Sequence, residues 1–278
     1  MNKLIVKNTI SNIIKSSTIR KINDNIIKNN LMAQKLKILS KIPYPIKQYY
    51  NSVIPLNIYQ TWHTKQLPEK MFESIKLIKN LNPRFNYQLF NDNDCREFIK
   101  NNFNTEVLYA FDSLIPGAYK ADLWRYCILY KNGGIYLDIK YRPLNNFRFI
   151  TMTEKEHWVL DSDKNGIYNA LMVCKPENEI LLKAINKIVE NVKNKYYGNS
   201  SLEPTGPHLL ASFFSTNEKY KFNMKHSFYN SHENRFIHFN GYLIFKSYTD
   251  YLKEQSNNKK TEHYHDLWMK KNIYNNIC

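Results

Sequence analysis

The chain has 278 residues, of which 43% are hydrophobic and 21 are tyrosines, so it can bury a sizeable core and is not a disordered chain. Its net charge of +16 favours anionic partners, although a composition rich in Lys, Asn and Ile also arises from an AT-rich coding genome. The four cysteines are far apart, which argues against a disulfide scaffold or a zinc-ligand pattern and leads us to expect a reducing, cytoplasmic location.

The first 50 residues are expected to form a basic helical extension that precedes a domain over residues 51–278. Isoleucines and leucines recur there at near-helical intervals, and basic residues greatly outnumber the single acid, Asp24. One interpretation is that these helices pack on the domain. The other is that they dock on an anionic membrane or a partner protein, which would make the protein peripheral to a membrane. Neither a membrane-spanning run nor a secretory signal is expected.

Between residues 54 and 94 the pattern predicts a strand, a helix and a second strand. The apolar stretch 54–62 beside a proline predicts the first strand, and residues 68–80 predict the helix. The second strand is expected at 87–90. Asp92 and Asp94 follow it, and we interpret them as helix N-caps rather than as ligands.

The stretch 118–144 combines a helix, a glycine stop and a strand that ends at a carboxylate. Its apolar, helix-periodic part ends at Gly133 and Gly134, and glycine suits a helix C-terminus because it adopts a left-handed conformation easily. Residues 135–137 predict a short buried strand with Asp138 at its carboxyl end. In α/β sheets that end is where ligands bind.

Asp122 and Arg125 are three residues apart, so they share one face of the predicted helix. A buried helix face carries an acid and a base only when both have partners. The two residues therefore predict either a ligand site or a buried ion pair that holds the helix in place.

The remaining pattern continues the alternation of strands and helices. Strands are expected at 158–160 and 170–174, with Asn169 just before the second, and a helix at 176–192. This alternation predicts an α/β fold with a mainly parallel central sheet.

The stretch 118–144 resembles the DXD sugar-binding region of a glycosyltransferase family. That family is glycosyltransferase family 32-like and includes initiating α-1,6-mannosyltransferases and capsular polysaccharide transferases, with clostridial glucosylating toxins as distant relatives. Its pattern is roughly R-A-D-[LF]-x-R-Y, an apolar stretch, then G-G-[IV]-Y-x-D-x-D. The chain has KADLWRY at 120–126 and GGIYLDIK at 133–140, so Lys140 stands where the second Asp is expected. Residues 54–62, 205–207 and 262–274 also resemble family segments.

The resemblance implies a GT-A-type nucleotide-sugar-binding fold and a retaining transferase. Such an enzyme moves a hexose or N-acetylhexosamine from a nucleotide-diphosphate sugar, with a UDP-sugar favoured, to a glycan, protein or lipid. In relatives the tryptophan after the first strand stacks on the base, a role carried over to Trp62. Asp122 and Arg125 would hold sugar hydroxyls, and Trp268 would close over the donor. The residues assigned to the donor are Gln60, Thr61, Trp62, Asp122, Arg125, Tyr136, Asp138, Gly206, Pro207 and Trp268.

The departing diphosphate gains negative charge, so positive charge must lie beside it. The usual solution is Mn²⁺ or Mg²⁺, for which Asp138 with His263 or Asp266 would supply ligands. Because an ammonium cannot ligate a metal, the alternative is that Lys140 itself neutralises the diphosphate. We expect residues 138 and 140 to project to the same side of a strand. The candidate catalytic residues are Asp138, Asp122, Arg125, Lys140 and Asn169, the last as a candidate on the β-face of the sugar.

Two rival functions follow from the same residues. Lys140 in place of an aspartate fits a nucleotide-sugar-binding protein that has lost transfer activity. The basic charge alone fits a nucleic-acid-binding protein, but it is not interleaved with a known nucleic-acid motif, so no specific nucleic acid is expected.

Overall fold

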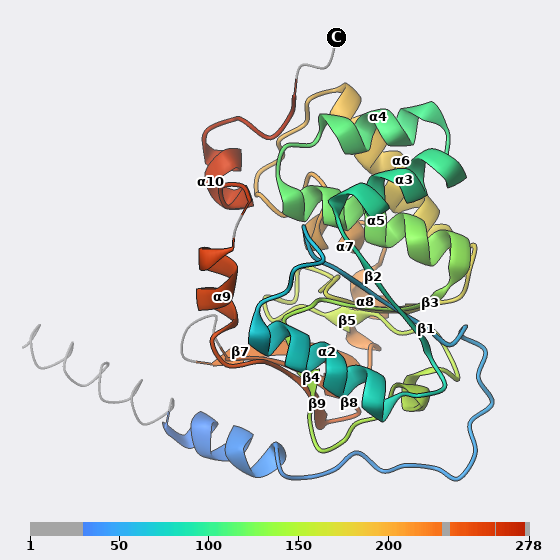
Figure 1. Ribbon diagram of the computed structural model, residues 1–278, viewed down its shortest axis with the longest axis vertical. Coiled ribbons are helices and arrows are strands. Elements are labelled where there is room, and N and C mark those ends of the chain that lie inside the picture. The colour runs from blue at the N-terminus through green and yellow to red at the C-terminus, as the bar shows by residue number, and fades with distance from the viewer. Residues whose placement is uncertain (1–29, 230–233, 259, 276–278) are drawn as a thin grey trace, which may run out of the picture.

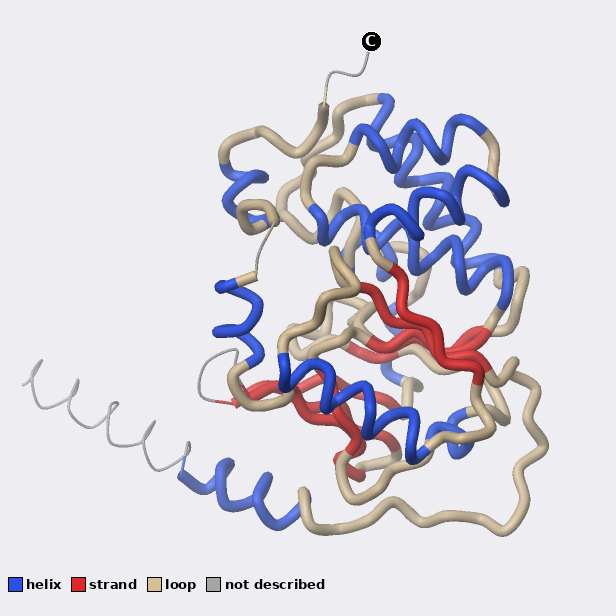
Figure 2. Tube along the Cα trace, in the orientation of Figure 1, coloured by secondary structure: helices blue, strands red, loops and turns tan. Residues whose placement is uncertain are grey.

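The computed structural model describes residues 30–229, 234–258 and 260–275, and this part of the chain contains two β-sheets. Helices α3 to α6 cover one face of the four-stranded sheet, and the five-stranded sheet lies with α2 on its other side (Figure 1 and Figure 2). The helices are α2 (Glu69–Leu81), α3 (Asp92–Asn102), α4 (Thr105–Ser113), α5 (Gly117–Asn132), α6 (Glu179–Lys193), α7 (Pro207–Ala211), α8 (Thr216–Tyr220), α9 (Tyr251–Asn257) and α10 (Tyr264–Met269), with a 3₁₀ helix at Phe149–Met152.

The four-stranded sheet is mainly parallel and has the order β2-β1-β3-β6. Its strands are β1 (Asn57–Thr61), β2 (Asn86–Phe90), β3 (Gly134–Leu137) and β6 (Leu171–Cys174). Strand β1 pairs in parallel with β2 and β3, whereas β6 runs antiparallel to β3. The expectation of an α/β fold with a mainly parallel central sheet is therefore confirmed.

The five-stranded sheet, of order β4-β9-β8-β7-β5, was mostly not predicted. Its strands are β4 (Tyr141–Pro143), β5 (Val159–Leu160), β7 (Met224–Tyr229), β8 (Asn234–Phe239) and β9 (Tyr242–Ser247). All of its pairs are antiparallel except β5 with β7. Strand β4 follows β3 after three residues, so the chain passes from one sheet to the other directly beside Asp138.

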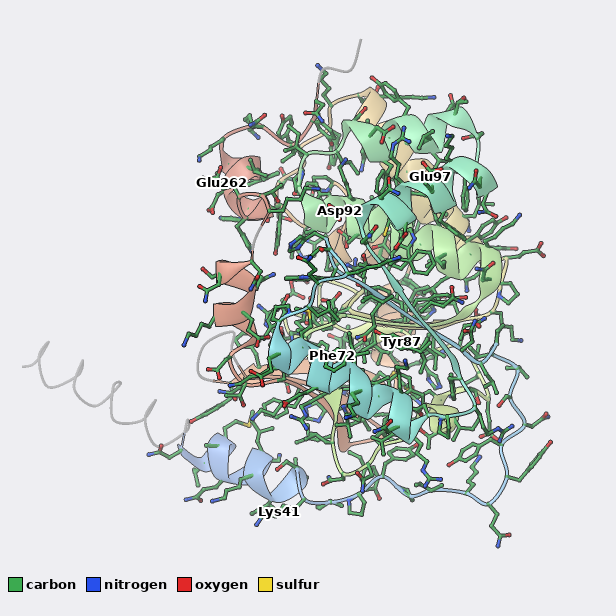
Figure 3. All side chains as sticks on the ribbon, viewed as in Figure 1. Lys41, Phe72, Tyr87, Asp92, Glu97 and Glu262 are labelled. Atoms are coloured by element: carbon green, nitrogen blue, oxygen red, sulfur yellow. The ribbon has the colours of Figure 1, made fainter. Side chains whose placement is uncertain are left out.

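The alternation of side chains along the central strands builds two hydrophobic layers. Tyr59 and Tyr136 join the cluster under helices α3 to α6, while their neighbours Ile58 and Ile135 join the cluster between the sheets. Side chains fill the space between the layers (Figure 3). The strands are therefore covered on both faces, and their ends are the places where polar residues reach the surface.

The junction of α5 and β3 is built as predicted. Gly133 has φ 60° and Gly134 has φ 116°. A Cβ on Gly133 would lie 2.7 Å from the ring of Pro176, so both the backbone angle and the space require glycine. The helix therefore stops where the sequence indicates, and β3 begins at once.

The N-cap assignment before α3 needs a correction. Asn91 is the N-cap, since its side chain accepts a hydrogen bond from the Asp94 backbone N–H at 2.9 Å. The Asp94 carboxylate accepts from the Asn91 N–H at 3.1 Å, and Asp92 is the first helical residue. Asn91 and Asp94 thus form a capping box, which satisfies two backbone donors reciprocally.

Residues 30–39 are helical, and Leu36 packs against Phe236 and Leu243 of the five-stranded sheet. The expectations for residues 1–29 lie outside the described residues, and the boundary at residue 50 stays a prediction. Within the ranges that the structure describes, no helix is both long and apolar enough to cross a bilayer.

Candidate functional site

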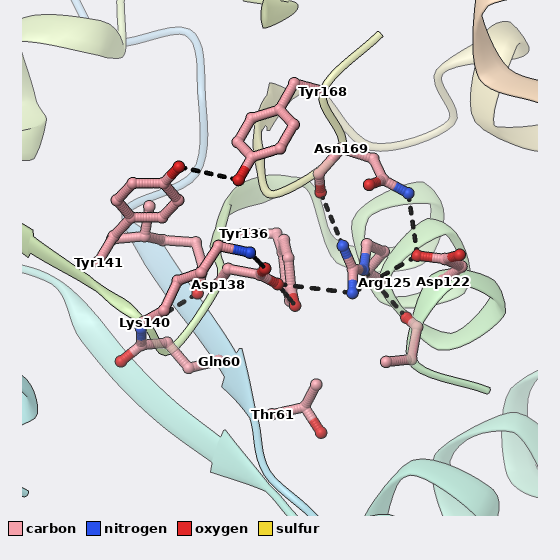
Figure 4. A network of polar contacts seen from close by, with 12 residues as sticks. Gln60, Thr61, Asp122, Arg125, Tyr136, Asp138, Lys140, Tyr141, Tyr168 and Asn169 are labelled. Carbon is pink, nitrogen blue, oxygen red and sulfur yellow. Dashed lines mark hydrogen bonds and ion pairs between the residues drawn. The ribbon is translucent and has the colours of Figure 1, made fainter. Parts of the chain in front are cut away.

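Three charged side chains meet at the carboxyl end of β3 (Figure 4). Arg125 lies between two carboxylates, with its Nη2 atom 3.5 Å from Oδ1 of Asp122 and 3.5 Å from Oδ1 of Asp138. Helix α5 holds Asp122 and Arg125 on one face, as their spacing predicts. Helix, glycine stop and strand therefore bring the three residues together.

Arg125 is fixed in place on all sides. Its Nε donates to the Ala121 carbonyl at 3.1 Å, its Nη1 donates to the Asn169 carbonyl at 2.9 Å, and its guanidinium lies 4.4 Å from the Tyr136 ring centroid. Burial lowers the pKa of Arg125, but Tyr136, Asp138 and Asp122 outweigh this and raise the pKa above its ordinary value. The site thus has a permanent, immobile cation.

Asp122 is buried and its hydrogen bonds are already made. Oδ1 accepts from Asn169 Nδ2 at 2.9 Å, and Oδ2 accepts from Thr205 Oγ1 at 2.8 Å. Burial raises the pKa of Asp122, an effect that Arg125, Thr205 and Asn169 oppose. A Cβ on Gly206 would lie 3.4 Å from Oδ2 of Asp122, so the loop after Thr205 fits closely against this carboxylate.

Asn169 takes part in this network as a positioning residue. Besides Asp122, its Nδ2 donates to the hydroxyl of Tyr126 at 2.8 Å, and that hydroxyl donates to the Thr205 carbonyl at 3.1 Å. Asn169 is 5% exposed. Both amide hydrogens are thus used within the protein, and the role of Asn169 on the sugar face stays a prediction.

Asp138 is the most open member of the charged group. Its side chain is 21% exposed, compared with 12% for Lys140 and 7% for Arg125. Oδ1 accepts from the Tyr136 hydroxyl at 2.7 Å, and Oδ2 forms an ion pair with Lys140. Burial raises the pKa of Asp138, but Lys140 and Arg125 lower it by more, to about 2. Asp138 is therefore an ionised hydrogen-bond acceptor at neutral pH.

Lys140 reaches Asp138 for a reason other than the one predicted. Strand β3 ends at Leu137, and the Tyr141 N–H donates to the Asp138 carbonyl at 3.0 Å, so residues 138–141 form a turn. The two side chains meet across this turn and not through alternation along a strand. Burial lowers the pKa of Lys140, but Asp138 outweighs this and raises it, so Lys140 is a cation.

A group of tyrosines and a second arginine surrounds Lys140, and the sequence did not reveal it. The Lys140 Nζ atom lies 5.5 Å from the ring centroids of Tyr141 and Tyr168, whose hydroxyls are hydrogen-bonded to each other at 2.8 Å. Burial lowers the pKa of Arg235 on β8, but Tyr168 and Tyr141 raise it by more. Burial raises the pKa of Tyr251 and Tyr264, the first residues of α9 and α10, and the charge of Lys140 opposes this rise in both.

The residues assigned at the end of β1 have structural partners. Gln60 is fully buried, donates to the Leu137 carbonyl at 3.1 Å and accepts from the Tyr87 hydroxyl at 2.9 Å. Thr61 donates to the Phe90 carbonyl at 2.9 Å. These bonds align the ends of the parallel strands. Contacts with a donor stay predictions for both residues.

Trp62 lies beside the turn that carries Asp138. It packs at the edge of a small cluster that contains Ile139 and Tyr248, and its ring centroid is 4.7 Å from that of His63. Its buried Nε1 atom has no hydrogen-bond partner within the described residues. The position agrees with a base platform, which stays a prediction. A hollow of about 500 Å³ opens near the end of β2, lined by Lys65, Phe90 and Asp94 among others, and it does not include Asp138.

Two of the tail residues assigned to the site, Trp268 and His263, have structural partners, and their contacts with a donor or a metal stay predictions. Trp268 donates from Nε1 to the Tyr197 carbonyl at 2.7 Å and so anchors α10 to a neighbouring loop. His263 caps α10 by accepting from the His265 N–H, and both His263 and Asp266 are exposed. The ring centroid of Tyr264 lies 5.9 Å from that of Tyr119 on α5, and burial and Asp122 raise the pKa of Tyr264. Pro207 begins α7, and its carbonyl accepts from the Ile167 N–H at 3.0 Å.

The residues present do not fit a Mn²⁺ or Mg²⁺ ion. Both oxygens of Asp138 are engaged, and the neighbouring charges are Arg125 and Lys140, neither of which can ligate a metal. In residues 30–229, 234–258 and 260–275, no three His, Cys, Asp or Glu side chains are placed to hold a metal. The expected group of Asp138, His263 and Asp266 is thus not assembled.

Comparison with known proteins gives a match over the segment that contains Asp122, Arg125 and Asp138. Residues 68–160 match the family described as "Glycosyltransferase sugar-binding region containing DXD motif". Inositol phosphoceramide mannosyltransferase 3 of Schizosaccharomyces pombe is 30% identical over 187 residues, which cover 67% of this chain and 52% of the relative. The initiation-specific alpha-1,6-mannosyltransferase of Candida albicans is 30% identical over 91 residues, 31% of this chain and 24% of the relative.

The chain spans about half the length of the first of these relatives and about a quarter of the second. Among solved structures, the PaToxG glycosyltransferase aligns with a TM-score of 0.46 and 15% identity, over 70% of this chain and 78% of that one. The matched residues 68–160 include Asp122, Arg125, Asp138 and Lys140. This segment is therefore similar to the sugar-binding region of glycosyltransferases that contain the DXD motif, here with a lysine as the third residue of that motif.

Proposed function

We propose that this protein transfers a hexose from a nucleotide-diphosphate sugar to an acceptor hydroxyl. One observation carries the proposal: an ionised, partly open Asp138 lies at the carboxyl end of β3, flanked by the fixed cations Arg125 and Lys140. This arrangement lies within the segment that matches the family. It could accept hydrogen bonds from sugar or ribose hydroxyls and meet a diphosphate with positive charge.

The arrangement suggests a division of roles. Asp138, whose side chain is 21% exposed, is the member that a ligand would touch first, and Lys140, its ion-pair partner, would meet the diphosphate. Asp122 and Arg125, which are already hydrogen-bonded to Asn169, Thr205 and backbone carbonyls, would hold Asp138 in position. Tyr251, Tyr264 and Tyr168 would help to exclude water, which otherwise hydrolyses an activated donor. Retention by a front-face route, in which the departing phosphate deprotonates the acceptor, is carried over from the family as part of the proposal.

The donor and acceptor are proposed from the relatives. Their names describe a mannosyltransferase of inositol phosphoceramide and an α-1,6-mannosyltransferase, so we include mannose beside the UDP-linked sugars that the sequence resemblance favours. A lipid with an inositol phosphate headgroup, or a glycan, is the acceptor class that these names support.

We further propose that residues 30–53 contact an anionic membrane surface. This segment exposes several large apolar side chains, and its only charged residues are lysines. The exposed apolar residues are Leu31, Met32, Ile38, Ile42, Ile46, Tyr49 and Val53. A basic segment with apolar side chains facing outward is typical of interfacial binding. Such contact would bring the site close to a lipid acceptor.

The function is tested by incubating the full chain with GDP-mannose, UDP-glucose and UDP-N-acetylglucosamine, with and without an inositol phosphate lipid. We expect donor hydrolysis or transfer with one of them, and Asp138→Asn should remove it. Binding of a nucleotide sugar without any turnover would support the rival function of a protein that has lost transfer activity. The absence of both binding and turnover would contradict the proposal.

A further inference from the structure

We propose that Lys140 takes the place of a divalent cation and neutralises the donor diphosphate. The inference rests on the proposed function and concerns the same site. It follows from the hydrogen bonding of the two carboxylates, the charges around them and the position of Lys140.

The first observation is that the carboxylates are already committed to protein donors. Asp122 accepts from Asn169 and Thr205, at 2.9 and 2.8 Å, on separate oxygens. Asp138 accepts from Tyr136 on one oxygen and pairs with Lys140 on the other. A metal at either carboxylate would have to share oxygens that already accept hydrogen bonds from a buried or half-buried framework, next to the cations Arg125 and Lys140.

The second observation is the charge next to Asp138. Oδ2 of Asp138 is paired with Lys140, and Oδ1 lies 3.5 Å from Nη2 of Arg125, so two cations that cannot ligate a metal adjoin this carboxylate. Both would repel a divalent cation at Asp138, whereas a diphosphate would be attracted to them.

The third observation is the position of the Lys140 ammonium. It is paired with Asp138, the most exposed carboxylate of the group, keeps 12% exposure of its own, and lies 5.5 Å from each of the Tyr141 and Tyr168 ring centroids. An ammonium has three donors, and the one hydrogen bond described for it is to Asp138. Lys140 can therefore keep its partner and still donate to phosphate oxygens. In the family pattern, the second motif aspartate occupies this position.

Isothermal titration of UDP and GDP into the full chain tests the inference, once in EDTA and once in Mn²⁺. We expect one of the nucleotides to bind with dissociation constants that agree within about threefold in the two conditions. Lys140→Met should weaken binding in EDTA about 10- to 100-fold, the loss expected for one charge-assisted hydrogen bond. Lys183→Met makes the same chemical change at an exposed position of α6 and should bind as the parent does.

Two further variants separate charge from fold. Lys140→Arg keeps a cation that cannot ligate a metal, so binding in EDTA should persist even if Lys140→Met does not fold. Lys140→Asp restores the motif carboxylate, so binding should be weak in EDTA and recover in Mn²⁺. Near-ultraviolet circular dichroism of each variant verifies the fold.

The possible results lead to different conclusions. Binding to the parent chain that requires Mn²⁺ overturns the charge role of Lys140 but leaves the proposed function intact. Unchanged affinity of a folded Lys140→Met variant in EDTA overturns the inference as well. No binding of either nucleotide in any condition overturns the proposed function together with the inference.

Discussion

Replacing Arg125 by methionine tests whether the charged group is held together as described. The change removes the cation that lies 3.5 Å from both Asp122 and Asp138, together with two hydrogen bonds to backbone carbonyls. Asp138 keeps Lys140 and Tyr136, so the cost falls mainly on Asp122. Removing one partner of a buried ion pair typically costs about 3–5 kcal/mol, and we expect a loss of unfolding free energy of this size.

The loss should also depend on pH in a defined direction. Burial already raises the pKa of Asp122, and Arg125 is the strongest influence opposing it. Without Arg125 the folded-state pKa rises further above the unfolded value, so the variant is relatively more stable when Asp122 is protonated. The difference in unfolding free energy between parent and variant should therefore be smaller at about pH 5 than at about pH 8.

Urea unfolding followed by circular dichroism measures both quantities, and Arg96→Met is the matched control. Arg96 forms a two-point pair with Asp112, at 2.8 and 2.7 Å, but its side chain is 39% exposed. An exposed pair of this kind contributes about 1 kcal/mol or less. A cost for Arg125→Met no larger than that for Arg96→Met would refute the reasoning.

Four further predictions follow from the structure. Asp138→Asn should lower transfer by about 100-fold or more, and it should also lower the thermal unfolding temperature, because it leaves the little-exposed cations Lys140 and Arg125 without the charge of Asp138; unchanged turnover in a folded variant would contradict this. Gly133→Ala should lower the free energy of unfolding in urea by about 2 kcal/mol or more, because the new Cβ would lie 2.7 Å from Pro176. Gly241→Ala is the control, since Gly241 also has a positive φ but nothing lies within 4 Å of its Cβ position, and it should cost about 1 kcal/mol. Equal costs would argue against the packing reason. Burial lowers the pKa of His157 to about 4, below its ordinary value of about 6.5. The neutral imidazole therefore contributes fully to the free energy of unfolding above about pH 6.5, and up to about 3 kcal/mol is lost as the pH falls towards 4. His157→Gln should flatten this part of the plot of stability against pH, and an unchanged slope would speak against the reasoning. Ile38→Ser combined with Ile42→Ser should reduce co-sedimentation with phosphatidylserine vesicles, whereas Phe72→Ser, at an exposed apolar residue of α2, should not; equal effects would remove the case for a docking segment.

The centre of the site could be predicted because its geometry is local. The three-residue spacing of Asp122 and Arg125 fixes a shared helix face, and the glycine pair fixes where the helix stops. Asp138 then follows β3 at the sheet edge. These steps need only helix periodicity, glycine conformation and sheet topology.

The surroundings of the site could not be predicted, because they depend on how distant segments meet. Tyr168, Arg235 and Tyr264 come from three separate parts of the chain, and no periodicity relates them to Lys140. The contact of Lys140 with Asp138 depends on where β3 ends, and strand ends are difficult to locate from sequence. Trp268 was assigned by its place in a motif, and its hydrogen bond to the Tyr197 carbonyl, which the sequence does not reveal, holds its indole in the protein.

One missed element did have a signal in the sequence. Asn240 and Gly241 separate two runs rich in β-branched and aromatic residues, and Asn-Gly is a strong indication of a two-residue hairpin. Both residues have positive φ, 49° and 85°, and they connect β8 to β9. The pair therefore locates the hairpin that carries Arg235 towards the site.

A crystal structure of the full chain with a bound nucleotide sugar tests the central claim most directly. Soaks with GDP-mannose, UDP-glucose and UDP-N-acetylglucosamine should show a diphosphate oxygen within hydrogen-bonding distance of Lys140 Nζ. A sugar or ribose hydroxyl should be bound to Asp138. A nucleotide bound elsewhere on the protein, with Asp138 and Lys140 still paired only to each other and to their protein neighbours, would contradict the account.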